Sequence, residues 1–182
     1  MQHDSKGREA MLVIFGGLPG TGKTSIAREL ANELGAVYLR IDSIEQAILA
    51  SPASGGSLED AGYRVAYAVA EDNLRLGLAV IADSVNPLQI TRNAWLDVAQ
   101  RANATAVEIE ITCSDAEQHR DRVESRVADI PGARLLTWQE VASREYEAWD
   151  REHIVIDTAG HSVSESVQRL REALRGALKP SG

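Results

Sequence analysis

The sequence predicts an α/β fold in which a mostly parallel β-sheet is covered by helices on both faces. Three observations favour this class. Short apolar runs alternate with longer segments of helical periodicity, a glycine-rich loop directly follows the first apolar run, and 182 residues suit one compact domain. Because neighbouring parallel strands need long crossover connections, this alternation is typical of a sheet whose crossovers are helices.

The five apolar runs have the length of buried strands, and we predict strands at 11–15, 36–41, 78–82, 106–112 and 153–157. The first helix is predicted at 24–34, where Ile26, Leu30 and Leu34 share one stripe and Gly35 provides a stop. The remaining helical patterns cover 44–50, 58–76, 88–102, 115–126, 138–149 and 163–178. Thr137 and Glu140 have the spacing of a capping box at the start of one of them.

The organisation along the chain is simple. Residues 1–10 are polar and are predicted to form a flexible tail, and residues 11–182 to form a single domain. Residues 127–137 contain a Pro-Gly pair between two helical patterns and are predicted to be a lid-like loop.

Composition and charge exclude several function classes. No apolar stretch reaches the roughly 18 residues of a membrane span, and Cys113 is the single cysteine, which precludes an internal disulfide and favours a cytoplasmic location. The net charge of −8 and the absence of a basic run disfavour binding to duplex nucleic acid.

Residues 17–24, "GLPGTGKT", match the phosphate-loop pattern G-x-x-x-x-G-K-(S/T) at every defined position. A predicted strand precedes the motif and a predicted helix follows it, as the pattern requires. Glycines allow a backbone path in which several amides point at one anion, and the helix N-terminus adds partial positive charge. The predicted cradle comprises Gly17, Gly20, Thr21 and Gly22.

The polar residues that end this motif predict ATP and Mg²⁺ as ligands. The ammonium group of Lys23 can reach the β- and γ-phosphates, the hydroxyl of Thr24 can ligate Mg²⁺, and Ser25 can donate to an α-phosphate. Together with the alternating pattern, the motif predicts the three-layer α/β/α fold of P-loop nucleotide-binding proteins.

The absence of two motifs narrows the kind of P-loop protein that the sequence can be. No N-K-x-D-like guanine reader follows a late strand, and Asp83 is followed by Ser84 rather than by a glutamate that would activate water. These absences favour transfer of the phosphoryl group to a small molecule. A nucleotide-dependent regulator or ATPase that uses water as acceptor, and a module that binds nucleotide without chemistry, remain alternatives.

Two aspartates stand at predicted strand ends, where ligands bind in α/β sheets. Asp42 can accept the proton of an acceptor hydroxyl that attacks the γ-phosphorus, or it can cap the helix that follows. Asp83 can hold a Mg²⁺-bound water, or it can be a loop or cap residue. Nearby polar residues are candidates for binding the acceptor, or for the solvated surface: Arg40, Asn86 and Arg92.

Arg122 and Arg126 have i, i+4 spacing on the predicted helix 115–126, which leads into the loop that carries Arg134. Arginines placed there can stabilise the charge that spreads over the γ-oxygens as the loop closes. The alternative is surface pairing, because acidic residues such as Glu124 and Asp129 lie nearby.

The motifs resemble those of the small P-loop kinases, which include chloramphenicol phosphotransferase, adenylylsulfate kinase, gluconate kinase, zeta toxins and the polynucleotide kinase domain. The resemblance runs from residue 11 to about residue 178 and rests on "GGLPGTGKTSIARELA", "YLRIDSI", "HRDRVESR" and "REYEAWDREHIVIDTAG". Short chains of this kind are often labelled "AAA family ATPase". The segment 126–138 lacks the adenylylsulfate kinase lid pattern, and 51–75 matches no member closely enough to name a substrate.

The resemblance implies a five-stranded parallel sheet in the order 2-3-1-4-5 with a helical lid. It implies that Asp42 is the general base, that Arg122 and Arg126 are lid arginines, and that the adenine lies near Thr158. The expected function is therefore an ATP-dependent phosphotransferase that acts on a hydroxyl of a small molecule. A polynucleotide or nucleotide kinase is a further alternative.

Overall fold

The computed structural model of the chain describes residues 10–52, 58 and 60–177. Five parallel strands form one sheet in the order β2-β3-β1-β4-β5, which confirms the order that the resemblance implied. Apart from Ala10, the predicted N-terminal tail lies outside the described residues. The strands are β1 (Met11–Gly16), β2 (Val37–Arg40), β3 (Val80–Asp83), β4 (Thr105–Thr112) and β5 (Ile154–Asp157).

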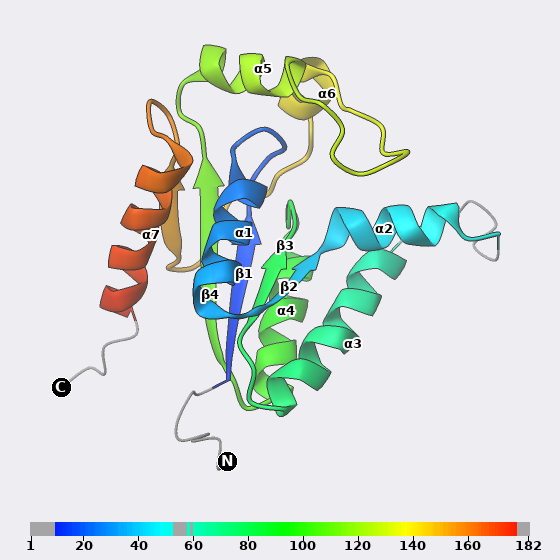
Figure 1. The fold of residues 1–182 in the computed structure, drawn as a ribbon, viewed down its shortest axis with the longest axis vertical. Coiled ribbons are helices and arrows are strands. Elements are labelled where there is room, and N and C mark those ends of the chain that lie inside the picture. Colours follow the sequence, from blue (N-terminus) through cyan, green and yellow to red (C-terminus); the bar gives the residue numbers. More distant parts are fainter. Residues whose placement is uncertain (1–9, 53–57, 59, 178–182) are drawn as a thin grey trace.

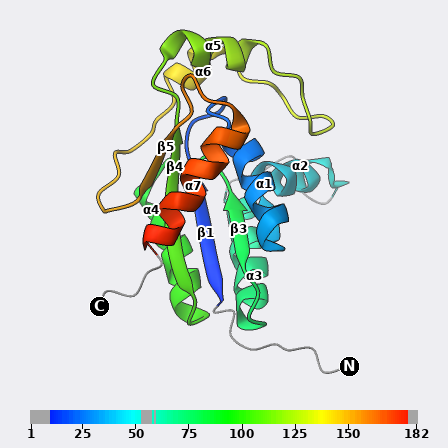
Figure 2. The same ribbon diagram turned by 60° about the vertical axis from the view of Figure 1, so that its left-hand side comes forward.

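Helices cover both faces of this sheet (Figures 1 and 2). The helices α1 (Lys23–Leu34) and α7 (Val163–Ala177) pack on one face around Ile26 and Leu170, and α3 (Ala61–Arg75) and α4 (Gln89–Arg101) pack on the other around Leu74 and Trp95. Three shorter helices lie beyond the carboxyl ends of the strands, and they are α2 (Ile41–Ala50), α5 (Ala116–Glu124) and α6 (Trp138–Ala142).

β1 lies at the centre, between β3 and β4, and five of its six residues are buried. Strands that are covered on both faces read as continuous apolar runs, which is why "MLVIF" predicted this strand correctly. Its carboxyl end delivers the glycine-rich loop to the edge of the sheet where the other strands also end.

Helix boundaries differ from the expected ones by up to seven residues, and at α2 and α5 the difference moves a candidate site residue. α2 begins at Ile41 rather than at residue 44, because Ile41 packs in the core directly after β2. α5 ends at Glu124, two residues early.

α6 stops at Ala142 rather than at residue 149. At residues 147–148 the backbone hydrogen-bonds to the loop before α4 and to the side chain of Arg92 instead of continuing a helix. The amide of Glu147 donates to the carbonyl of Pro87 at 2.9 Å, and the carbonyls of Glu147 and Ala148 accept from Arg92. The capping box of Thr137 and Glu140 is confirmed at the start of this helix.

Among the helices that the structure describes, none combines the length and apolar character of a membrane span.

Candidate active site

The glycine-rich loop depends on backbone conformations that side chains resist. Gly17, Gly20 and Gly22 have φ values of 135°, 88° and 93°. A Cβ atom at position 17 would lie 2.3 Å from the carbonyl oxygen of Ile111, and therefore only glycine fits there.

Carbonyl groups of this loop are engaged by groups on its outer side. The hydroxyl of Thr21 donates to the carbonyl of Leu18 at 2.9 Å, and the hydroxyl of Thr158 lies 2.8 Å from the carbonyl of Thr21. The carbonyl of Pro19 lies 2.8 Å from Nε2 of His119, a histidine that is buried although its isolated place in the sequence does not predict this. With these carbonyls directed outward, the loop can present amides to its interior.

The first turn of α1 is prepared for an anion. Its N-cap is Gly22, which has no side chain to cap the helix, and its first backbone bond runs from the amide of Ile26 to the carbonyl of Gly22. The amides of Lys23, Thr24 and Ser25 are therefore the orphan donors of a helix N-terminus. Lys23 as a whole residue is 7% exposed, and its side chain lines the cavity and forms no hydrogen bond or ion pair with the described part of the chain. A cation at the cavity wall without a counter-charge suits an anionic ligand.

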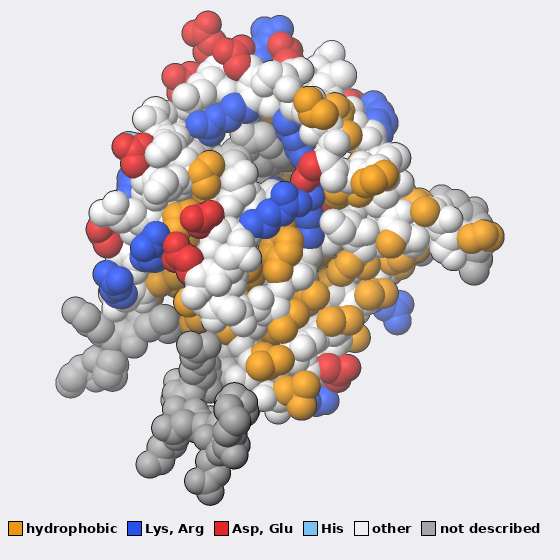
Figure 3. All heavy atoms as spheres, viewed as in Figure 1, with side chains coloured by type: hydrophobic (Ala, Val, Ile, Leu, Met, Phe, Trp, Pro, Cys, Tyr) orange, Lys and Arg blue, Asp and Glu red, His pale blue; other side chains and the backbone are white. Residues whose placement is uncertain are grey.

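A cavity of about 770 Å³ opens from this loop. It extends between the phosphate loop, α1, α2 and the irregular segment 125–137, and Lys and Arg side chains border the hollow between α5 and α1 (Figure 3). Most of the predicted site residues line it, and these are Gly20, Gly22, Lys23, Thr24, Ser25, Arg40, Asp42, Arg122, Arg126 and Thr158.

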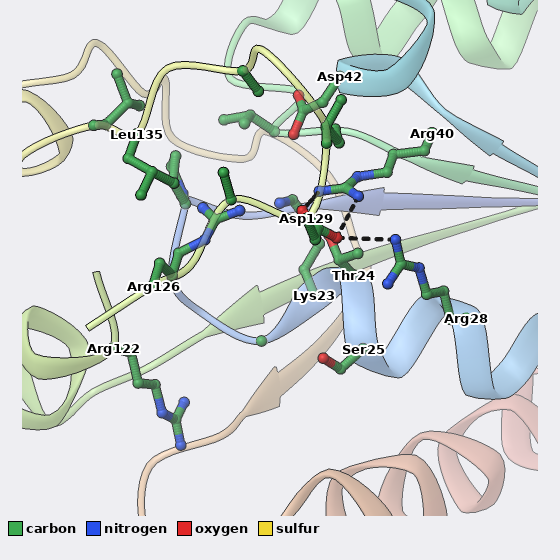
Figure 4. A pocket seen from close by; sticks show the side chains of 18 of the residues that line it. Lys23, Thr24, Ser25, Arg28, Arg40, Asp42, Arg122, Arg126, Asp129 and Leu135 are labelled. Carbon is green, nitrogen blue, oxygen red and sulfur yellow. Dashed lines mark hydrogen bonds and ion pairs between the residues drawn. The ribbon is translucent and has the colours of Figure 1, made fainter. Parts of the chain in front are cut away.

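On one side of the cavity, Arg122 donates to the hydroxyl of Thr158 at 2.8 Å and to its carbonyl at 3.1 Å. Arg126 comes from the loop beyond the end of α5, so the prediction that both arginines share one helix face is wrong. Its side chain nevertheless reaches toward Lys23, whereas that of Arg122 points toward the loop after β5 (Figure 4). The two arginines therefore address different parts of the cavity.

On the other side, α2 contributes two carboxylates. Asp42 lies in the first turn of α2 and its side chain caps no helix amide, so the N-cap interpretation is wrong. Glu45, one turn further, also lines the cavity. Burial, and then the negative charge of Asp42, raise the pKa of Glu45 above its ordinary value, while the nearby Arg144 opposes this rise.

Arg40 points into the same side of the cavity and is 5% exposed. Its guanidinium makes a two-pronged contact with Asp129 of the 125–137 segment, Nη1 to Oδ2 at 2.7 Å and Nη2 to Oδ1 at 3.0 Å. Arg28 of α1 donates to the same carboxylate at 3.0 Å.

Asp83 is 2% exposed at the end of β3, next to Phe15 of β1 in the sheet register. The hydroxyl of Tyr38 donates to its Oδ2 at 2.6 Å. Burial, and then the charge of Asp83, raise the pKa of Tyr38, which keeps this hydroxyl protonated and donating. One oxygen of Asp83 is thereby fixed in place.

Two predicted acceptor residues do not reach the cavity. Asn86 is fully buried with φ of 51°, and neither it nor Arg92 lines the cavity. Arg92 is also fully buried. Its guanidinium donates to the carbonyls of Asn86, Pro87, Glu147 and Ala148. With its donors used in this way, Arg92 holds the segment after α6 against α4, and its prediction as an acceptor ligand is corrected.

We expect Arg92→Met to lower the free energy of unfolding by about 3 kcal/mol, because four backbone carbonyls lose a charged donor inside the protein. The rings of Tyr146 and Trp149, 5.3 Å and 4.3 Å from the guanidinium carbon, lose a cation–π contact as well. Urea unfolding measures the change. Arg101→Met is the matched control on the same helix, since this exposed residue pairs with Glu71 at the surface and should cost less than about 1 kcal/mol. Equal losses for both variants would contradict a structural role for Arg92.

Several residues that line the cavity were not predicted from the sequence. Arg28 follows Thr24 by four positions on one helix, a spacing that could have shown it. Glu45 follows Asp42 by three positions on α2, and this spacing could have shown that the two carboxylates face the same side. Arg144 and the pairing of Asp129 with Arg40 carried no signal, because both depend on how irregular segments pass over the cavity.

Comparisons with known proteins agree with this geometry. Residues 12–144 match a family model described as an AAA domain. Kti12 of Chaetomium thermophilum in complex with ADP-AlF3 is 20% identical, with a TM-score of 0.68 over 92% of this chain and 99% of that one. The APS kinase CysC of Mycobacterium tuberculosis in complex with AMPPNP and APS is 19% identical, with a TM-score of 0.66 over 92% and 98%.

A gluconokinase of Sinorhizobium meliloti 1021 is 15% identical, with a TM-score of 0.59 over 95% of this chain and 100% of that one. At these identities the likeness establishes the fold, which is the P-loop α/β fold. No curated protein matches the chain.

Proposed function

The chain belongs to the AAA domain family, whose model spans most of it, and we propose that it is an ATP-dependent phosphotransferase that acts on a hydroxyl of a small molecule. One observation carries this proposal. The carboxylates of Asp42 and Glu45 line the same cavity as Lys23 and Thr24 of the phosphate loop. A base and a phosphate cradle that face one cavity are what transfer to a hydroxyl requires.

ATP supplies the γ-phosphoryl group. In this proposal the loop amides and Lys23 hold its phosphates, and Arg126 adds a positive charge above them. Thr158, held by Arg122, lines the side of the cavity where the resemblance predicts the adenine. The 125–137 segment forms one wall of the cavity and serves as the lid that excludes water.

Thr24 and Asp83 are the proposed residues for Mg²⁺, which would neutralise charge on the phosphates when bound. Both offer hard oxygen atoms, at the start of α1 and at the end of the adjacent β3. Magnesium in such sites takes one or two protein groups, with phosphates and water completing its shell. Thr24 lines the cavity and would hold the ion directly, whereas Asp83 lies behind the lining residues and would hold it through a bound water.

We expect Tyr38→Phe to raise the Mg²⁺ concentration needed for half-maximal support of nucleotide binding by about tenfold, because Asp83 loses the hydroxyl that orients it. Calorimetric titration of AMPPNP at a series of Mg²⁺ concentrations measures this directly, without relying on turnover. Tyr67→Phe provides the control, because its hydroxyl donates to the carbonyl of Thr91 at 3.3 Å, outside the phosphate loop. An unchanged Mg²⁺ dependence in Tyr38→Phe would argue against the role of Asp83.

The roles of the chain's own residues in the transfer are simple. Asp42 takes the proton of the acceptor hydroxyl as its oxygen bonds to the γ-phosphorus, and the bond from that phosphorus to the bridging oxygen of ADP breaks. Lys23 and Arg126 stabilise the negative charge that spreads over the transferred oxygens.

The neighbour of Asp83 favours transfer over hydrolysis. Ser84 is 3% exposed and its hydroxyl donates to the carbonyl of Phe15 at 3.4 Å. A serine at this position supplies no carboxylate that could activate water, and its hydroxyl is already bonded to the backbone. The similarity to APS kinase and gluconokinase structures supports a kinase, although it names no acceptor for this chain.

A mass-spectrometric screen tests the proposal. The protein is incubated with Mg²⁺, ATP and pooled metabolites and antibiotics, with Asp42→Asn as the matched control. We expect one compound to gain a phosphoryl group with the wild type and not with the variant. ADP that accumulates at the same rate with and without every pool, with no phosphorylated compound, would instead identify water as the acceptor.

A further inference from the structure

Two arginines converge on one carboxylate at the acceptor side of the cavity, and the 125–137 segment supplies that carboxylate. Arg40 donates to Asp129 with both terminal nitrogens, and Arg28 donates to the same carboxylate from α1 (Figure 4). We propose that Arg40 and Arg28 form the binding site for an anionic group on the phosphoryl acceptor, most fittingly a phosphate monoester, and that Asp129 occupies this site in its absence. This inference rests on the proposed function and deepens it.

The contact of Arg40 and Arg28 with Asp129 is called the clasp below, and Arg40 is its fixed partner. The side chain of Arg40 is 4% exposed at the carboxyl end of β2, whereas that of Asp129 is 41% exposed on an irregular segment. A buried guanidinium needs an anion nearby, and Asp129 is the carboxylate that hydrogen-bonds to it within the described residues. When the segment 125–137 moves to admit an acceptor, another anion has to take the place of Asp129.

The geometry of the clasp suits an oxyanion. The guanidinium fork binds two oxygens of one group, which a phosphate presents as well as a carboxylate does. Two guanidinium groups meet one carboxylate here, and the negative charges of Asp42 and Asp83 also act on Arg40. A phosphate offers more acceptor oxygens to the two guanidinium groups than a carboxylate does.

Protonation does not open the clasp near neutral pH. Hydrogen bonding from Arg40, and then the charges of Arg40 and Arg28, lower the pKa of Asp129 to about 2. Because the folded pKa lies below the ordinary value of 3.8, the clasp stabilises the closed segment above about pH 4 and is lost only as pH falls toward 2. Displacement by a competing anion is the remaining way to release it.

The position of the clasp is right for an acceptor. Arg40 precedes Asp42 by two residues, and Arg28 follows Thr24 by one helical turn. Figure 4 shows Asp129 next to Thr24, between the two arginines. An anion held there places the rest of its molecule between the proposed base and the γ-phosphate, which would give the enzyme a preference for acceptors that already carry a phosphate.

Sulfate titration of the full chain tests the site. The phosphate loop is first saturated with Mg²⁺ and AMPPNP, and sulfate binding is then measured by calorimetry. We expect Asp129→Asn to bind sulfate about tenfold more tightly than the wild type, because a charged competitor is removed. Asp121→Asn, an exposed aspartate of α5, is the matched control and should equal the wild type.

Adding Arg28→Gln to Asp129→Asn should return the sulfate affinity to about the wild-type value, and this exposed arginine can be replaced without disturbing the core. Acetate should bind more weakly than sulfate. Equal sulfate affinities in the wild type, Asp129→Asn and the double variant would overturn the proposal. AMPPNP binding is recorded in the same samples, so failure of the proposed function shows as loss of that binding, while the two variants alone decide the anion site.

The acceptor screen supplies a second arm when its pools are divided into phosphorylated and uncharged compounds. We expect the product in the phosphorylated pool, with Arg28→Gln raising its KM and leaving kcat nearly unchanged. A product found only among uncharged compounds, with the same KM in Arg28→Gln as in the wild type, would refute the anionic acceptor.

Discussion

Lys23→Ala is expected to weaken ATP binding about a hundredfold and to lower phosphoryl transfer by about a thousandfold. The ammonium group is the cation with which the phosphate loop lines the cavity, and charged hydrogen bonds to phosphate are worth about 1.5–3 kcal/mol each. Its contribution grows as charge develops on the transferred oxygens, so turnover falls further than affinity does.

The free protein should not lose stability in this variant. The side chain of Lys23 lines the cavity and forms no hydrogen bond or ion pair with the described residues, so its removal takes no polar contact from the free protein. We therefore expect a melting temperature without nucleotide at or above that of the wild type. A loss of binding in a protein that remains fully folded separates the ligand role of Lys23 from a structural one.

Thermal shift assays measure the effect. ATP at about 100 times the wild-type Kd should stabilise the wild type by about 2.7 kcal/mol, and a variant that binds a hundredfold more weakly by about 0.4 kcal/mol. Arg120→Ala, which removes an exposed cation of α5 that pairs with Glu124, serves as the control and should keep the wild-type shift. A full shift in Lys23→Ala would refute the assignment of the phosphate loop.

The fold was predictable because its signals are local. β1 is buried on both faces, so its apolar run marked a central strand, and the eight residues of the phosphate loop specify their own backbone path. The strand order needed the family resemblance, since no local pattern states which strands pair. At α6, where the predicted helix end was wrong, tertiary contacts replace helical bonds. The buried Arg92 makes two of these contacts, although the sequence predicted it to bind the acceptor or to lie on the solvated surface.

The candidate site also has one half that was predictable from the sequence and one half that was not. The nucleotide half follows from one contiguous motif, and Gly20, Gly22, Lys23 and Thr24 line the cavity as expected. Gly17 and Thr21 do not line it, and their amides donate to the carbonyls of Val85 and Leu18. The acceptor half is assembled from β2, α2, α1 and the 125–137 segment, so residues that meet there are far apart in the chain. Asp129 and Arg40 are separated by 89 positions, and spacing arguments cannot bring such a pair together.

Asp42→Asn is expected to lower kcat by about a thousandfold while changing the Kd of ATP by less than about twofold. General-base catalysis contributes about 10² to 10⁴ in rate, and Asp42 lines the acceptor side of the cavity and lies outside the phosphate loop. Single-turnover transfer and AMPPNP titration measure the two quantities. Asp72→Asn on the exposed side of α3 is the control and should match the wild type in both.

Glu45 is the rival base, and its ionisation separates the two assignments. Burial and the charge of Asp42 raise the pKa of Glu45, so Asp42→Asn removes a negative neighbour and moves that pKa downward. If Glu45 were the base, the acidic limb of the kcat profile would shift to lower pH in Asp42→Asn with the plateau retained, and Glu45→Gln would abolish transfer. If Asp42 is the base, Asp42→Asn loses the plateau itself and Glu45→Gln keeps most of it. Because both carboxylates lie on one helix turn, this contrast in pH profile identifies the one that takes the proton.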